Sequence, residues 1–422
     1  MMGTARYSDR IQTGMDVGSN KICCAITEID SGGSSVKLLG IGLGPSGGLL
    51  KGSIVHRDQL INGMDFALRE AQKMANLTVD KLTLGISGNH IRGINTQGAI
   101  AIQSEGAAAM HLQSEITPND VHLVLDQAKA ISLPVDRDIL HVLPQEFIID
   151  SMNSIKDPVG LTGRRLEAKV HLITAATTAA TNLASCAEEL GISVDGLIFQ
   201  GLASGIAVLD EDEKKLGAAC IDIGATTTDV VVYHEGGIRH AAVLGIGADS
   251  ITNDIAVMLQ IGIEEAEKIK LKYGSAKASL SSPELEFELL TKSGGLNRKI
   301  SEHELSRYIE ARMIEILQLI KREIARGGIK EKLTYGMVLT GGGAMLKNIV
   351  GLAQENLGIP VRVGNPRNIS GVVDIANSPI YAGALGLAQW KQLGNDITLA
   401  NSKISPVYSV IANVKKWIQD FF

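Results

Sequence analysis

The sequence predicts an α/β protein with two lobes and a ligand-binding cleft between them, and three observations lead to this prediction. The chain has 422 residues, which is more than one simple hydrophobic core usually holds. A motif of an apolar residue, Asp, an apolar residue and Gly occurs twice, about half a chain apart. In the second half, a strand-like apolar segment runs directly into three consecutive glycines.

Composition limits the class of protein. Hydrophobic residues make up 45% and charged residues 20% of the chain, which is typical of globular proteins. The net charge is -6 and Lys/Arg runs do not exceed pairs, so no nucleic acid partner is expected. The four cysteines lack C-x-x-C spacing and predict reduced, buried thiols. Because the first residues lack the apolar core of a signal peptide and no long apolar run follows, we expect a cytosolic protein.

The repeated motif predicts two β-hairpins that bind phosphate. The segments are MDVGSNKICCAI at 15–26 and IDIGATTTDVVVY at 221–233, each a pair of β-rich runs around a glycine turn. Gly18 and Gly224 allow the backbone to approach a ligand closely. The residues after each glycine offer successive N–H groups and hydroxyls to phosphate oxygens. These residues are Ser19, Asn20, Lys21, Ala225, Thr226 and Thr227.

The aspartates just before the turns predict a metal site. Two carboxylates that face each other across a cleft, here Asp16 and Asp222, can hold a hydrated Mg²⁺. Lys21 adds a positive charge toward the phosphate. The segment MVLTGGGAMLKNI at 337–349 completes the predicted site, because its glycines let the backbone lie flat against a ring or a sugar. These glycines are Gly341, Gly342 and Gly343.

Other nucleotide-binding motifs are missing or incomplete. The chain has no G-x-x-x-x-G-K-[ST], which excludes a P-loop protein. The segment GLGPSG at 42–47 matches G-x-G-x-x-G, but Pro45 lies within it and no helix pattern follows. We therefore expect a flexible loop at this position.

The order of two phosphate hairpins and a glycine-rich loop resembles the actin-like ATPase superfamily over nearly the whole chain. The resemblance implies a two-lobed, ribonuclease H-like fold that binds ATP and Mg²⁺. Two small-residue segments, QGLASGIAVL at 200–209 and SPIYAGALGLA at 378–388, are similar to the helices that join the lobes. The resemblance also implies further nucleotide contacts. These are Glu267 and Lys270, in a segment similar to the one that reaches ribose and adenine, together with Gly247 and Met345.

Within the superfamily, three segments resemble the FtsA family and its inserted subdomain, 1C. They are GISGNHIRGINTQGAIAI at 85–102, EITPNDVHLVLDQAKAI at 115–131 and IKDPVGLTGRRLEAKVHLIT at 155–174. The middle segment predicts a helix with Thr117 as its N-cap residue and Pro118 in its first turn. We also expect a helix from Asp58 and a long helix from Ser301 to the glycine pair at 327–328.

The resemblance divides the chain into subdomains. The first lobe, 1A, takes residues 1–84, 168–208 and 373–390, and the 1C insertion takes 85–167. The second lobe, 2A, takes 209–250 and 313–372, and its insertion, 2B, takes 251–312. A flexible linker is expected at 391–406 and an amphipathic helix at 407–422.

The final helix is expected to bind a membrane surface. Its apolar residues follow helical spacing, and its polar residues fall on the other side. Periodicity alone leaves open whether it docks on the protein itself. The preceding linker, the terminal position and the paired lysines favour the membrane. The residues expected at the lipid surface are Val414, Lys415, Lys416, Trp417, Ile418, Phe421 and Phe422.

The resemblance implies a cell-division function. The protein is expected to polymerise on the inner face of the cytoplasmic membrane at the division site. There it would anchor FtsZ and, through 1C, recruit later division proteins. The C-terminal peptide of FtsZ is expected on residues 251–312, near Arg298, Lys299 and Arg312.

Two departures from the family pattern bear on catalysis. Gln200 occupies the place where filament-forming relatives often have a Glu that orients water, so Gln200 is the candidate water-positioning residue. Ala225 stands where a second glycine is usual. ATP binding with at most slow hydrolysis is therefore expected. The alternative functions are that of a PilM-like pilus-assembly protein and that of a sugar kinase of the same superfamily.

Overall fold

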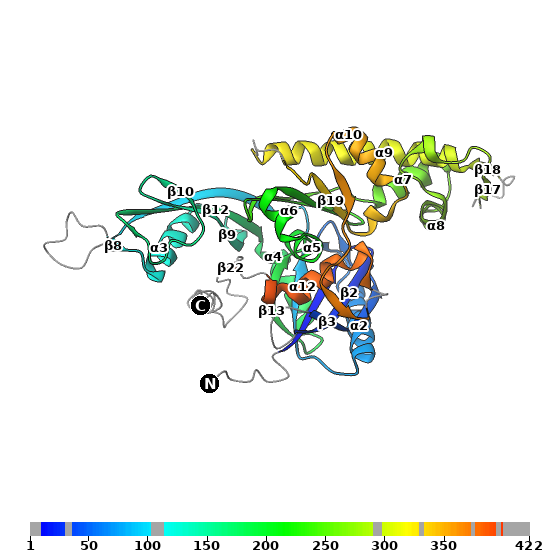
Figure 1. Ribbon diagram of the computed structural model, residues 1–422. Coiled ribbons are helices and arrows are strands. Elements are labelled where there is room, and N and C mark those ends of the chain that lie inside the picture. The colour runs from blue at the N-terminus through cyan, green and yellow to red at the C-terminus, as the bar shows by residue number, and fades with distance from the viewer. Residues whose placement is uncertain are drawn as a thin grey trace.

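The computed structural model describes residues 10–29, 36–102, 114–289, 298–328, 333–372, 376–393 and 398–399. Figure 1 shows two lobes, each a β-sheet with helices packed against it, and an insertion that extends sideways from them. The predicted α/β class and two-lobed arrangement are confirmed. Among the helices in these ranges, none combines the length and the apolar character needed to cross a membrane.

The first lobe is built on a six-stranded sheet with the order β13-β6-β1-β2-β3-β21. The first predicted hairpin forms its centre, where β1 (Ile11–Val17) pairs antiparallel with β2 (Lys21–Ile29). Ile22 and Cys24 face the helices on one side of the sheet, and Cys23 faces the helix on the other side. The remaining elements are β3 (Val36–Pro45), β4 (Leu49–Leu50), β5 (Ser53–Ile54), β6 (Lys81–Ile86), β13 (Ser193–Phe199), β21 (Ile369–Gly371), α2 (Arg57–Ala75) and α4 (Thr177–Glu188).

The segment GLGPSG was expected to be a flexible loop, and this expectation is wrong because most of the segment lies in strand β3. Helix α2 packs directly on β3. A Cβ atom at Gly42 would collide with a backbone oxygen of Ala67 on α2, and one at Gly44 would collide with that of Gly63. Glycine at these positions lets the helix and the strand approach closely. The motif therefore marks helix–sheet packing.

The 1C insertion contains a sheet with the order β10-β9-β12-β7, and helix α3 (Pro118–Lys129) packs on it. The expected helix cap is confirmed, because Thr117 Oγ1 accepts the N–H of Asp120 at 3.3 Å. Strand β12 continues past the boundary expected at residue 167. The strands are β7 (Arg92–Ala101), β8 (Ser114–Glu115), β9 (Arg137–Ile149), β10 (Met152–Ile155), β11 (Thr162–Gly163) and β12 (Arg165–Ala176).

The second lobe is built on a five-stranded sheet with the order β16-β15-β14-β19-β20, and the second predicted hairpin lies within it. The strands are β14 (Ala218–Ile223), β15 (Thr228–His234), β16 (Gly237–Leu244), β19 (Met337–Thr340) and β20 (Val361–Val363), with a separate pair of β17 (Glu286–Leu289) and β18 (Arg298–Ser301). The helices are α6 (Glu211–Leu216), α7 (Asp249–Leu259), α8 (Ile263–Tyr273), α9 (Glu302–Arg326) and α10 (Ile349–Leu357).

Two expected helix starts can be compared with the structure. Ser301 caps α9 as expected, since its Oγ accepts the N–H of Glu304 at 3.1 Å, and α9 ends at Gly327. The buried side chains of α9 form one apolar stripe that packs into the core of the second lobe. The helix expected from Asp58 begins one residue earlier, at Arg57.

Helices α5 (Gln200–Val208) and α12 (Ala382–Leu393) cross where the two lobes meet. They are the small-residue helices expected to join the lobes. At the crossing, a Cβ atom at Gly386 on α12 would collide with the backbone of Ala203 on α5. The absence of a side chain at residue 386 therefore sets the distance between the two helices.

The chain after residue 390 departs in part from the expected linker. Helix α12 continues to Leu393, and β22 (Thr398–Leu399) pairs with the edge of β9 in 1C. Part of the segment 391–406 is thus regular structure. The expected membrane helix at 407–422 lies outside the described residues.

We expect Gly386→Ala to destabilise the protein by about 1–3 kcal/mol, because the added methyl group meets the backbone of α5, which cannot rotate away. Gly351→Ala on α10 is the matched control, since a Cβ atom there meets no neighbour and alanine favours the helix. Urea unfolding of both variants measures the difference. Equal stabilities of the two variants would contradict the close crossing.

Candidate functional site

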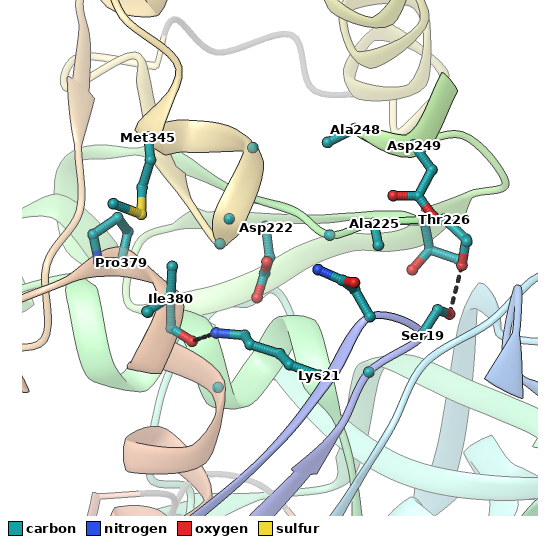
Figure 2. A pocket seen from close by; sticks show the side chains of 18 of the residues that line it. Ser19, Lys21, Asp222, Ala225, Thr226, Ala248, Asp249, Met345, Pro379 and Ile380 are labelled. Carbon is teal, nitrogen blue, oxygen red and sulfur yellow. Dashed lines mark hydrogen bonds between the residues drawn. The ribbon is translucent and has the colours of Figure 1, made fainter. Parts of the chain in front are cut away.

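A cavity of about 410 Å³ lies between the two lobes, within the size range of small-molecule sites. Both hairpin turns, the glycine loop, helix α8 and the start of α12 line this cavity. Figure 2 shows Ser19 and Lys21 of the first hairpin facing Asp222 and Thr226 of the second. Of the residues expected to contact nucleotide, the cavity brings together all except Gly247. They are Asp16, Gly18, Ser19, Asn20, Lys21, Asp222, Gly224, Ala225, Thr226, Thr227, Glu267, Lys270, Gly341, Gly342, Gly343 and Met345.

The two hairpin turns have the same geometry. The N–H of Gly18 donates to the carbonyl three residues later at 3.1 Å, and the N–H of Gly224 does the same at 2.9 Å. The turns meet across the cavity, where Ser19 Oγ lies 2.7 Å from Thr226 Oγ1 (Figure 2). Each turn presents backbone N–H groups and a hydroxyl to the same space, which is an arrangement that can hold phosphate oxygens.

Gly247 lies behind the second turn. A Cβ atom at this position would collide with the backbone oxygens of Gly224 and Ala225. The residues that follow it hold the turn in place, because Ala248 N–H donates to the Gly224 carbonyl at 3.0 Å and Asp249 N–H donates to the Ala225 carbonyl at 2.8 Å. Gly247 thus supports the turn, whereas Ala248 and Asp249, which the sequence analysis missed, line the cavity.

Lys21 connects the first hairpin to the start of α12. Its ammonium group donates to the carbonyl of Ile380, in the 3₁₀ turn η3 (Pro379–Tyr381), and lies 5.5 Å from the centre of the Tyr381 ring. The same positive charge acts on Asp16 and Asp222, where it partly offsets the effect of burial on the pKa of each carboxyl. The lysine is therefore placed to serve both the carboxylates and an anionic ligand.

Five carboxyl groups line the cavity, and three of them, Asp16, Asp222 and Asp229, belong to strands of the two sheets. Burial raises the pKa of Asp16 to about 7. Burial also raises the pKa of Asp222, although the hydroxyl of Ser204 donates to its Oδ2 at 2.5 Å. The third, Asp229 on β15, has a pKa well above its usual range because it is buried and close to Asp222. The sequence analysis missed Asp229, although a charged residue within the apolar run of the second hairpin was a signal.

Gln200, the candidate water-positioning residue, is held at the start of α5. Its side chain lies between Gly85 and Gly383, because a Cβ atom at either glycine would collide with its amide. The amide hydrogen-bonds to Asp16, and within the described part of the chain its buried Oε1 has no partner. This oxygen packs against Gly85, and the expected role of Gln200 in positioning water stays a prediction.

The far end of the cavity carries a paired charge. The Nζ atom of Lys270, which is 7% exposed, lies 2.6 Å from Glu267 Oε2 and 2.8 Å from Thr252 Oγ1. Lys270 holds the Glu267 carboxylate in place. The acceptor positions of Glu267 that Lys270 does not use can bind ligand hydroxyls. On the opposite side, Gly341 has a φ of +79°, and a side chain there would collide with Asp222. Glycine is therefore required at this position.

The donor set of the cavity suits an anionic ligand together with a hydrated cation. Within the described ranges, no group of three or more His, Cys, Asp or Glu is placed to hold a metal ion by itself. Two carboxylates that face a phosphate-binding turn leave room for water and phosphate ligands, as Mg²⁺ requires. Asp16 and Asp222 are the residues that could hold it.

The charges expected to attract the FtsZ peptide are only partly available. Arg312 is already bound to Asp254, at 2.6 Å and 2.8 Å, and to Glu315. These contacts raise the pKa of Arg312 and compensate part of its charge, and its expected role toward the FtsZ peptide stays a prediction. Lys299 is exposed on β18, and the side chain of Arg298 lies outside the described part.

Comparisons with known proteins agree on one family. The family model "Cell division protein FtsA" matches residues 219–386, and the model "SHS2 domain inserted in FTSA" matches residues 88–174. The cell division protein FtsA of Pseudomonas aeruginosa is 36% identical, over 98% of this chain and 99% of its own length. FtsA of Escherichia coli K12 is 34% identical, over 98% of each chain.

Two solved structures share the fold. The PilM–PilN type IV pilus biogenesis complex has a TM-score of 0.64 at 17% identity, covering 90% of this chain and 98% of the other. MreB5 of Spiroplasma citri bound to ADP has a TM-score of 0.52 at 13% identity, covering 91% of this chain and 97% of the other. These structural similarities confirm the expected actin-like fold. At such low sequence identity they bear on the fold alone.

We expect Asp16→Asn to remove part of the pH dependence of stability in ligand-free, EDTA-treated protein. The pKa of Asp16 is raised from 3.8 to about 7 by burial, so its contribution is fully present below about pH 4 and is lost as the pH rises through about 7. Wild type should therefore lose more stability between pH 5 and pH 8 than Asp16→Asn. Urea unfolding at both values measures this. Glu70→Gln, at an exposed site on α2, is the control, and identical pH profiles for wild type and Asp16→Asn would contradict the assignment.

Proposed function

Because the chain belongs to the FtsA family of cell division proteins, we propose that it binds ATP with Mg²⁺ between its lobes and anchors FtsZ to the membrane. One observation carries the nucleotide part of this proposal. Two hairpin turns with the same closing hydrogen bond, far apart in sequence, meet at one cavity together with the glycine loop and the Glu267–Lys270 pair.

The proposed ligand places its phosphates between the two turns. The turns supply backbone N–H groups and hydroxyls, and Lys21 supplies a positive charge. The adenosine part lies against Gly341 to Gly343, with Glu267 accepting from the sugar hydroxyls. MreB5 of Spiroplasma citri, which has the same fold, was solved with ADP.

Charge balance supports the proposed Mg²⁺. Burial raises the pKa of Asp16, Asp222 and Asp229, and the positive charge of Lys21 offsets only part of this effect at Asp16 and Asp222. Buried carboxylates without enough positive charge are costly, and a divalent cation together with its phosphate ligands relieves this cost. Asp16 and Asp222 hold the ion through their oxygens and through water.

Hydrolysis in this site is slow at most. Gln200 lies beside Asp16 and is the proposed water-positioning residue, but an amide is not a base. The nucleotide therefore acts mainly as a switch for assembly. Because the chain is a member of the FtsA family, neither a pilus-assembly function like that of PilM nor a sugar kinase activity is proposed.

We propose that the C-terminal peptide of FtsZ binds the 2B insertion, residues 251–312. Exposed apolar side chains at the junction of α7 and α8 support this surface. Val257 is 73% exposed, Ile263 is 62% exposed, and Met258 lies beside them in the sequence. An apolar peptide gains free energy by covering such side chains, and Lys299 adds an exposed positive charge to the same insertion.

The protein polymerises on the cytoplasmic face of the membrane at the division site, with the helix at 407–422 as its peripheral anchor and 1C as the contact for later division proteins. Each anchor is weak by itself. A single amphipathic helix of this length with few basic residues binds lipid reversibly. A filament presents many helices at once, and the high effective concentration makes attachment stable.

We expect Asp222→Ala to weaken binding of fluorescent ATP by about 1–3 kcal/mol, because a charged contact to the metal and its bound phosphates is lost. Asp212→Ala, an exposed carboxylate on α6, is the matched control and should bind as wild type does. A titration with Mg²⁺ present measures all three proteins. Equal affinities would remove Asp222 from the site, and no binding by wild type would reject the nucleotide site.

We expect Trp417→Glu to release the protein, and with it FtsZ, from anionic vesicles without unfolding it, since the change places a charge on the apolar side of the helix. Gln419→Glu adds the same charge on the polar side and is the control. Co-sedimentation with vesicles and FtsZ, with and without ATP, measures how much of each variant and how much FtsZ pellet with the vesicles. If a chain ending at Asn401 pelleted as well as the full chain, the tail would not be the anchor.

A further inference from the structure

Two turns of the first lobe contact the second lobe beside the cavity. One turn, at Lys51 and Gly52, joins β4 to β5, and the other, from Ser87 to Asn89, follows β6. The backbone N–H of Lys51 donates to Thr226 Oγ1 at 3.2 Å, and Ser87 Oγ donates to Asp229 Oδ1 at 2.5 Å. Both bonds cross from one lobe to the other.

The two turns form one rigid unit. Lys51 has a φ of +50°, a left-handed conformation that a residue other than glycine keeps only where the surroundings fix it. A Cβ atom at Gly52 would collide with the backbone of Ser87 and Gly88, and Asn89 N–H donates to the Lys51 carbonyl at 3.2 Å. A movement of Ser87 relative to the second lobe therefore carries the other turn with it.

Asp229 is the partner of this unit in the second lobe. It is 3% exposed and lies on β15, directly opposite Asp222 in the antiparallel pair with β14. Ser87 supplies a hydrogen bond to its carboxyl group, and both residues line the cavity. Separating the lobes at this edge breaks that bond.

We propose that Ser87 and Asp229 form a latch between the lobes and that this latch sets the rate at which nucleotide leaves the site. The inference rests on the proposed nucleotide site and adds two positioning residues to it. Ser87 acts through the relative position of the lobes, since the nucleotide contacts residues of both. Removing its hydroxyl leaves the phosphate-binding turns intact and makes opening easier.

The test is the dissociation rate of fluorescent ATP, measured by a stopped-flow chase with unlabelled ATP and Mg²⁺. Ser87→Ala should dissociate about three- to tenfold faster, the change expected from one lost hydrogen bond, while its association rate stays unchanged. Ser87→Thr restores a hydroxyl and should return the rate toward that of wild type. Ser53→Ala, at an exposed site on β5, is the control for loss of a nearby serine.

Each outcome decides one part of the proposal. If wild type binds nucleotide and Ser87→Ala releases it at the wild-type rate, the latch is refuted and the nucleotide site stands. If wild type binds no nucleotide, the site and the latch fall together. A purely structural role for Ser87 would instead lower the unfolding midpoint of the ligand-free protein without separating the two rates, so urea unfolding of Ser87→Ala and Ser87→Thr completes the experiment.

Discussion

The close crossing of α5 and α12 is the contact on which the rest of the architecture depends. Gly386 has no side chain, so the two helices approach until the backbone of Ala203 fills its place. The same crossing brings the first residue of α5, Gln200, against Gly383 of α12 and beside Asp16 of the first hairpin. A wider crossing would separate these groups, and the carboxylate of Asp16 would no longer be held in place by Gln200. The packing at the junction of the lobes therefore determines where the residues of the cleft lie.

The lobes are also less independent than a pair of domains joined by a hinge. One hydrophobic core contains Ile91 and Ile173 from the first lobe and its insertion, together with Tyr233 and Ile238 from the second lobe. Gln145 of 1C adds a hydrogen bond to the carbonyl of Ile238 at 2.9 Å. Relative motion of the lobes must therefore preserve this side of the interface.

Sequence reasoning succeeded where a feature is local. The hairpin turns, the cap at Thr117 and the glycine pair after α9 depend on residues a few positions apart, so their pattern is visible in the chain. It failed where a role depends on a distant partner. Asp229 was missed because its partner, Ser87, is 142 positions away, and the ion pair of Arg312 with Asp254, 58 positions away, was not foreseen. GLGPSG was misjudged for the same reason, because the helix that requires its glycines packs on it from another part of the sequence.

The pairing of β22 with β9 gives the end of the chain a geometric limit. With Thr398 and Leu399 fixed to the edge of the 1C sheet, the chain has residues 400–406 before the proposed membrane helix begins at Val407. Even fully extended, such a tether reaches about 28 Å. A membrane bound by that helix must then lie within the length of this tether from the edge of β9. The two-residue strand β22 therefore determines which side of the molecule can face the lipid.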